Sequence, residues 1–486
     1  MIQGSTLNVA INPTGSKQLL DAESVVPGHL ELRNGVRTDA GNYKGRPGYV
    51  SAFATGVSQP VTMLIPFKRA ADRRGLAVME NGVVHELNAN WTTTPITGQT
   101  INGEFRPTWC IFDQTTIICS GQAPVKIDIG TTASLLGGNP PAARFCAVIA
   151  DRVVFSGYDD TGFTWTDAGT AESITPGLNE SSVTGHGESI KYMQVKDTDL
   201  YFFKTAGIEI WSHIGGIEVF GRRGIITLMD KFQRNRGIAS YSVVHAPVQG
   251  QKNEQFYFYC DGDFHRIIGF QVQTISGAYK RTIGDLQETE DIYGFHFAKE
   301  HLIRWFEPVS GRCFVYDYVN EVFTEDNRWE NAGWQRLPVY SYMEMDGVAF
   351  VGDYNPTGKI YRWGTDLFTD DGYPIRLDRS FRVPLSPEGK KARLNRMRLR
   401  VERGQGAVAS SPSAQVRWSF DEGDWTNWST VDLGESGDHD PYVDVREPNG
   451  VSSLGVGREV RIEVSQTSPV QHLLTHCLLT AKQLGR

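Results

Sequence analysis

Few residues of this chain combine the types and the spacing that catalysis requires. Residues 185–189 read Gly-His-Gly-Glu-Ser and could place a base beside a carboxylate, but no nucleophile lies near them in the sequence. A polar loop is the better interpretation of this segment. No nucleophile-elbow, zinc-protease, phosphate-loop or dinucleotide-binding motif stands in a convincing context. We therefore expect a protein that is not an enzyme, with no catalytic residues and no cofactor.

Patterns that could bind a metal are equally weak, and we expect no metal site. Residues 261–263 read Asp-Gly-Asp, which offers far fewer oxygen ligands than calcium requires, so a hairpin turn is the better interpretation. The six cysteines have no close pairing and no C-x-x-C spacing, which predicts buried, reduced thiols. They are Cys110, Cys119, Cys146, Cys260, Cys313 and Cys477.

One segment is close to a turn found in sialidases. Residues 419–425 read Ser-Phe-Asp-Glu-Gly-Asp-Trp, which approaches the Asp-box pattern S-x-D-x-G-x-x-W with the tryptophan one residue early. That box is a structural turn and does not itself carry glycosidase chemistry. A propeller sialidase also needs several arginines and a Tyr/Glu pair that converge in a central pocket. The sequence does not show whether such residues meet.

Three arginines form a candidate contact surface near the C-terminus. In the strand expected over residues 394–403, apolar residues alternate with Arg396, Arg398 and Arg400. The basic face would contact phosphates, an acidic partner or a neighbouring subunit. The alternative is a solvated sheet face, softened by the adjacent Glu402. We treat the three arginines as candidate partner or subunit contacts.

Residues 58–375 repeat one local plan, in which short apolar strands alternate with tight turns that contain Gly, Asn or Asp. The unit is roughly 35–45 residues long, near the length of a four-stranded propeller blade. Residues 201–203 and 256–259 are apolar on both faces, as expected for blades packed face to face. We predict a β-propeller-like body of about seven blades. In chain order, the seven expected units contain strands that begin near residues 61, 109, 145, 190, 241, 294 and 348.

The segments on either side of this body have different characters. Residues 1–57 are polar and rich in Gly and Asn, and we interpret them as an N-terminal arm or closing segment. Residues 374–387 are bounded by prolines and read as a linker. Residues 376–486 are predicted to form a C-terminal β-sandwich-like domain. Its strands are expected near residues 394–403, 415–420, 457–464 and 472–479. The fold class predicted for the whole chain is all-β.

The charge balance limits the classes of partner. Formal net charge is −8, from 48 basic and 56 acidic residues. This argues against sequence-specific DNA binding or anionic membrane binding as the main task, but not against a surface past which DNA slides. The first residues lack the basic and apolar regions of a signal peptide. No apolar run is long enough to span a bilayer. We expect synthesis in a cytoplasm and no membrane anchoring.

Several segments together resemble one protein family. The residues that carry the resemblance read RLNRMRL at 393–399, VRWSFDEGDW at 416–425, LGVGREVR at 454–461 and SQTSPV at 465–470. The lead-in sequence GRPGY at 45–49, followed by a propeller-like body, agrees with them. In this order and pattern the chain resembles the packaged-DNA stabilisation proteins, or tail nozzle (hub) proteins, of short-tailed bacteriophages.

The resemblance implies a structural virion protein of the viral tail, made in the host cytoplasm. Members of this family form a ring, typically a homohexamer, below the portal and its adaptor. The ring extends the DNA channel, helps to retain packaged DNA until ejection, and carries contacts for tail fibres, spikes or a plug. Duplex DNA passes such a ring transiently and without sequence specificity. The alternative function is a glycan-binding or sialidase-like β-propeller, which the near Asp-box and the abundant tryptophans favour.

Overall fold

The computed structural model of the chain is built almost entirely from β-strands. Within the residues that it describes, no helix has the length and apolar character needed to cross a membrane. Those residues are 5–10, 28–37, 43–69, 72–128, 132–185, 189–215, 219–228, 237–247, 254–277, 283, 286, 290–386, 389–401, 412–434, 442–445, 453–469 and 474–484.

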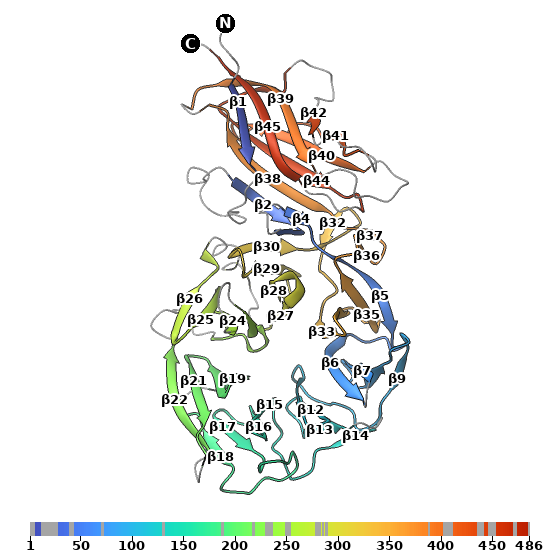
Figure 1. Ribbon diagram of the computed structural model, residues 1–486, viewed down its shortest axis with the longest axis vertical. Helices are drawn as coiled ribbons and strands as arrows, with labels where there is room; N and C mark the ends of the chain where they lie inside the picture. The colour runs from blue at the N-terminus through green and yellow to red at the C-terminus, as the bar shows by residue number, and fades with distance from the viewer. Residues whose placement is uncertain are drawn as a thin grey trace.

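Seven small sheets in the described residues are arranged around a ring, so the body is a β-propeller, as predicted (Figure 1). Blade 1 consists of β6 (Val61–Arg69), β7 (Asp72–Met79), β8 (Val84–Leu87) and β9 (Thr93–Pro95). Blade 2 consists of β11 (Thr108–Phe112), β12 (Thr115–Cys119), β13 (Val125–Ile127) and β14 (Thr132–Leu135), with β10 (Thr97–Gly98) parallel to β14. Blade 3 consists of β15 (Phe145–Ile149), β16 (Arg152–Ser156), β17 (Gly162–Trp165) and β18 (Glu180–Ser182). Blade 4 consists of β19 (Ile190–Lys196), β20 (Asp199–Lys204), β21 (Gly207–His213) and β22 (Phe220–Thr227).

Blade 5 consists of β23 (Val244–Pro247), β24 (Glu254–Cys260), β25 (Asp263–Ile268) and β26 (Gln271–Thr274). Blade 6 consists of β27 (Tyr293–Phe297), β28 (Leu302–Phe306), β29 (Cys313–Asp317) and β30 (Val322–Asp326). Blade 7 consists of β33 (Ser341–Met345), β34 (Val348–Gly352), β35 (Lys359–Gly364) and β5 (Gly48–Ala54). Short elements between them are η3 (Ser240–Ser242), η5 (Ala298–Glu300), β31 (Arg328–Glu330), β32 (Gly333–Gln335), β36 (Thr369–Asp370) and β37 (Tyr373–Pro374).

The blades pack face to face through apolar side chains. Phe202 and Phe203 are adjacent on β20 and both are fully buried. Phe202 contacts Phe163 of blade 3, whereas Phe203 contacts Phe256 of blade 5. Successive residues of a strand point to opposite faces of the sheet, so β20 contributes to two inter-blade cores. This explains why its sequence is apolar without alternation.

The ring is closed by a strand from near the N-terminus. β5 pairs antiparallel with β35 and forms the outer strand of blade 7. Its Tyr49 and Phe53 are buried, with Tyr49 stacked on Trp363 and Phe53 tilted against Phe350. Blade 7 therefore joins the beginning of the propeller to its end, and the ring cannot open without breaking this pairing.

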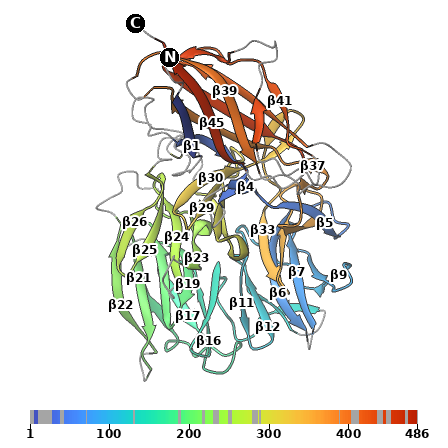
Figure 2. The ribbon, with the colours of Figure 1, turned by 45° about the horizontal axis from the view of Figure 1, so that its top comes forward.

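A β-sandwich lies beside the ring, next to blades 6 and 7 (Figures 1 and 2). One sheet contains β2 (Gly28–Arg33), β38 (Leu377–Pro384), β44 (Glu459–Gln466), β40 (Ser413–Phe420) and β41 (Ser429–Asp432). The other contains β1 (Ser5–Ala10), β3 (Gly35–Arg37), β4 (Tyr43–Gly45), β45 (Leu474–Gln483), β39 (Ala392–Val401), β42 (Tyr442–Val445) and β43 (Gly455–Gly457). Trp418, Met397 and Ile462 are fully buried in the core between the two sheets. The four C-terminal strands expected from the sequence are thus present as β39, β40, β44 and β45.

The prediction of a linker over residues 374–387 is wrong. Leu377–Pro384 forms β38, which pairs with β2 on one side and β44 on the other. Asp378, Arg379 and Ser380 are polar but buried within this strand. Their polarity hides the apolar alternation by which a strand is recognised in a sequence.

The propeller and the sandwich are joined through one continuous sheet and a buried ion pair. β30 of blade 6 pairs with β2, so a nine-stranded sheet runs from the blade into the sandwich. Arg46 lies at this junction, and its Nη1 and Nη2 donate to Asp370 over 2.9 and 2.5 Å. Arg46 also donates from Nε to Asn34 Oδ1 (3.0 Å) and from Nη2 to the Asn327 carbonyl (3.0 Å). The side chain therefore ties the lead-in segment to the segments that follow blades 6 and 7.

Candidate functional site

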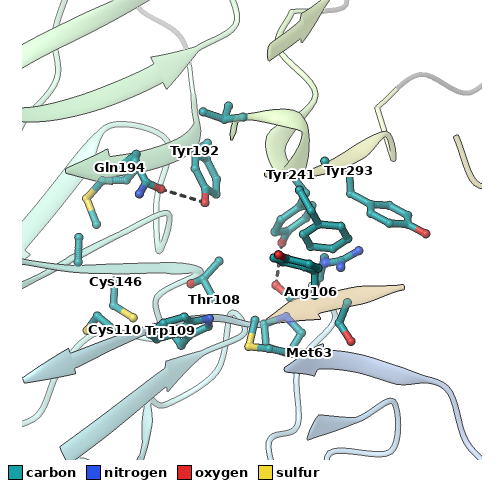
Figure 3. Close-up of a pocket in the computed structure, with 18 of the residues that line it drawn as sticks. Met63, Arg106, Thr108, Trp109, Cys110, Cys146, Tyr192, Gln194, Tyr241 and Tyr293 are labelled. Atoms are coloured by element: carbon teal, nitrogen blue, oxygen red, sulfur yellow. Dashed lines mark hydrogen bonds between the residues drawn. The ribbon is translucent and has the colours of Figure 1, made fainter. Parts of the chain in front are cut away.

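The innermost strands of the seven blades enclose a cavity of about 470 Å³ at the centre of the ring. Six of them contribute to its wall, as Met63 of β6, Trp109 of β11 and Tyr192 of β19 illustrate (Figure 3). Blade 5 contributes Tyr241 and Val243, which directly precede its innermost strand β23. The Tyr192 hydroxyl donates a hydrogen bond to Gln194 Oε1 on the same strand (3.2 Å). The centre of a propeller is where side chains from every blade converge, so it is the first place to look for a site.

A second cavity, of about 530 Å³, opens at the face where loops lead into the innermost strands. Arg106, Tyr241 and Tyr293 line both cavities. We call these three residues the throat, because they lie where the two cavities meet. Figure 3 shows Arg106 beside both tyrosines, with the Tyr241 hydroxyl donating to the Arg106 carbonyl over 2.9 Å.

The Arg106 guanidinium is surrounded by aromatic rings. Its Cζ lies 4.3 Å from the ring centroid of Tyr293 and 4.9 Å from that of Tyr340. Phe295 and Tyr241 follow at 5.5 and 5.9 Å. Nη2 also donates to the Tyr340 carbonyl. Aromatic faces carry partial negative charge and attract a guanidinium, so the rings hold Arg106 in place without neutralising it.

The electrostatics of the half-buried Arg106 differ from those of the fully buried Arg304. Among the described residues no carboxylate forms an ion pair with Arg106, and burial lowers its pKa, to which repulsion by Arg336 contributes. By contrast, Arg304 in blade 6 pairs with Asp326 at 2.9 Å and with Glu300 at 2.7 Å. Burial also raises the pKa of Tyr293 to about 12, which keeps its hydroxyl protonated.

Two further arginines lie around the throat. The Arg144 guanidinium lies 3.8 Å from the ring centroid of Phe105, and both residues line the second cavity. Arg336 lies behind the wall, where its Nη2 donates to the Tyr293 hydroxyl (2.6 Å) and its guanidinium lies 3.3 Å from the Tyr354 centroid. The floor of the second cavity is thus lined by arginine and aromatic side chains from loops of different blades.

Sequence reasoning missed the throat. Arg106 precedes β11 by two residues and Arg144 directly precedes β15, so each stands at the start of an innermost strand. Arginines within two residues of the first strand in two successive units are the signal that could have indicated a central basic site. The two arginines are far apart in the sequence, because all the strands of blade 2 lie between them. Their approach to the same cavity is therefore not visible in the sequence.

The residues predicted as a contact surface lie elsewhere, on the outer face of the sandwich. On β39, Met397 and Leu399 are buried whereas Arg396 and Arg400 are exposed. Arg396 donates to both carboxylate oxygens of Asp444 on β42, at 2.7 and 2.8 Å, and this raises its pKa. Arg398 and Arg400 extend over the ring of Tyr442, at 5.3 and 5.9 Å. The three arginines form one basic stripe on a sheet face; contact with a partner stays a prediction.

Replacing Arg396, Arg398 and Arg400 together by alanine is expected to leave the melting temperature nearly unchanged, because exposed ion pairs add little to stability. If the stripe meets an acidic partner, association with that partner weakens strongly. Lysine replacements at the three positions keep the charge and serve as the control. If association is unchanged in the alanine variant, the stripe is only a solvated face.

The other motifs examined in the sequence have structural roles. Asp261 and Gly262 both have positive φ and join β24 to β25 as a two-residue hairpin turn, as predicted. Asp421, in the near Asp-box, accepts hydrogen bonds from the backbone N–H groups of Arg458 (2.7 Å) and Glu459 (3.1 Å) in the sandwich. The six cysteines are buried and unpaired, as expected. Residues 186–188 lie outside the described residues.

Comparisons with known proteins give similarity of fold alone. No protein-family model and no curated protein matches the chain. The Neurospora crassa Pan2 WD40 domain aligns over 68% of this chain and 98% of its own, at 9% identity and a TM-score of 0.41. The extracellular domain of a putative hybrid two-component system from B. thetaiotaomicron aligns over 78% of this chain at 10% identity, with a TM-score of 0.45. PorZ of Porphyromonas gingivalis aligns over 79% at 9% identity and a TM-score of 0.38. In these last two alignments this chain spans 46% of the matched chain.

Proposed function

We propose that this protein is a structural, non-enzymatic component of a short-tailed phage virion, a tail nozzle or hub. Copies of the chain form a ring, six-fold in the family it resembles, below the portal and its adaptor. The ring extends the DNA channel, stabilises packaged DNA and docks fibres, spikes or a plug. The proposal is supported by the resemblance of residues 393–470 and 45–49 to that family.

The observation that carries the proposal is the joint between propeller and sandwich. The two bodies share a sheet through the pairing of Arg33 on β2 with Glu325 on β30, and Arg46 adds hydrogen bonds to Asn34 of the sandwich and to Asp370 beside blade 7. Inter-domain joints made by a flexible linker allow relative motion by default. A nozzle has to hold its shape against packaged DNA, so such a joint suits it.

The propeller's own centre does not suit the passage of DNA. Its cavity holds about 470 Å³ and is narrowed by the throat residues Arg106, Tyr241 and Tyr293. In the proposed ring the DNA channel therefore runs between subunits, along the axis of the assembly. The net charge of −8 suits a wall that repels phosphates. We expect weak, salt-sensitive affinity of the free protein for duplex DNA near physiological salt.

The direct test mixes the purified protein with DNA-filled heads that carry portal and adaptor, followed by electron microscopy and a DNA-release assay. A ring at the portal vertex and slower DNA loss are expected. Heads that lack the adaptor are the matched control and should not acquire the ring. If no ring forms, or if heads retain DNA equally well without the protein, the nozzle function is wrong.

A further inference from the structure

The second cavity has an ordered distribution of charge. Arg106, Arg144 and Lys191 line it and are half-buried. Four carboxylates also line it, and each of them is exposed. They belong to Glu80, Glu104, Glu290 and Asp291. The basic groups of the cavity are therefore less exposed to solvent than its acidic groups.

The two arginines have unused capacity to bind an anion. A guanidinium carries five N–H donors and stays charged in proteins. Arg106 donates from Nη2 to the Tyr340 carbonyl, and among the described residues neither Arg106 nor Arg144 forms an ion pair. The Arg144 Nε is buried without a hydrogen-bond partner. Because both guanidinium groups line the cavity without an ion-pair partner, a bound anion would supply the missing counter-charge.

We propose that this cavity binds an acidic sugar, with Arg106 and Arg144 holding its carboxylate and the carboxylates at the opening accepting hydrogen bonds from its hydroxyls. The volume of about 530 Å³ lies in the range of small-molecule sites. The rings of Tyr340, Tyr354 and Phe105 line the same cavity, each with a guanidinium over one face, and add apolar surface to its wall. This inference is independent of the nozzle function and can hold if that function fails.

The charges at the opening favour a sugar over other anions. An acidic peptide would bring further carboxylates against four already present, which is unfavourable. A phosphate group adds a second negative charge to the same environment. A monosaccharide with one carboxylate presents a single negative charge and several hydroxyl donors. These match the arginines of the cavity and its exposed carboxylates, respectively.

The test is calorimetric titration of the full chain with the methyl glycosides of N-acetylneuraminic acid and glucuronic acid. Binding of at least one of them is expected, and its methyl ester or a neutral methyl galactoside should bind at least about tenfold more weakly. Arg106→Gln and Arg144→Gln should each weaken binding by about tenfold or more. Arg362→Gln, on β35 of blade 7 and outside the lining of this cavity, is the matched control and should bind normally.

Melting temperatures separate a binding role from a structural one. Arg106→Gln removes a half-buried charge that lacks a carboxylate partner but also loses the contacts with the surrounding rings, so its melting temperature should change little. If neutral and acidic sugars bind equally, if neither binds at millimolar concentration, or if phosphate or uridine monophosphate binds in place of the sugars, the inference is overturned. Failure of Arg106→Gln to fold would leave Arg144→Gln as the deciding variant.

Discussion

Replacing Arg46 by alanine is expected to lower the free energy of unfolding by about 3–5 kcal/mol, the usual cost of leaving one partner of a buried ion pair alone. Burial lowers the pKa of Arg46, but the Asp370 carboxylate more than offsets this, and the net shift is upward. Asp370 thus stabilises the charged guanidinium in its buried position. Arg46→Lys should also destabilise, because one ammonium cannot reproduce the contacts to Asp370, Asn34 and Asn327.

Urea unfolding followed by tryptophan fluorescence measures this effect. Asp370→Ala should cost a similar amount, and the double variant should cost clearly less than the sum, because the two side chains compensate each other. Arg362→Ala breaks an ion pair with Asp366 at the surface and should cost only about 0–1 kcal/mol. An Arg46→Ala effect no larger than that of Arg362→Ala would show that the junction does not depend on the pair.

Phe53→Ala is expected to destabilise the propeller by about 3–5 kcal/mol, because it removes a buried aromatic side chain from the closing strand. Phe53 is fully covered and its ring contacts Trp91 at 5.3 Å and Phe350 at 5.6 Å. The loss should appear both in urea unfolding and as faster proteolysis within blade 7, since β5 is its outer strand.

Val50→Ala supplies the control within the same strand. Val50 is 38% exposed, so its truncation should change stability by about 0.5 kcal/mol or less. If Phe53→Ala and Val50→Ala have equal effects, packing of β5 does not close the ring, and the pairing with β35 alone would have to do so.

The blades could be predicted because their information is local. Alternating strands and hairpin dipeptides such as Asp261-Gly262 occur within each unit, and every unit corresponds to a sheet. The apolar runs at β20 and β24 even indicated burial on both faces. The basic stripe on β39 was equally visible, because Arg396, Arg398 and Arg400 alternate with residues of the sandwich core.

What the sequence hid depends on contacts between distant segments. β38 was taken for a linker because its buried Asp378, Arg379 and Ser380 interrupt the apolar pattern. Nothing in the lead-in sequence around Arg46 marks its partner, Asp370, which lies far along the chain. The throat brings together Arg106, Tyr241 and Tyr293 from three blades. No local pattern in the sequence marks residues that meet only when the propeller closes.

The pairing of β1 with β45 has a mechanical consequence. The two strands are antiparallel, with Ser5 opposite Ala481, so the two ends of the chain lie side by side on the sandwich (Figure 1). Tension applied between the ends would peel this pair one hydrogen bond after another, because the bonds lie across the strands. The chain then reaches the propeller only through β2, β4 and β38, which are themselves held in the sandwich. Force applied to the termini would thus unfold the sandwich first. The blades would carry no load until the sandwich had unfolded.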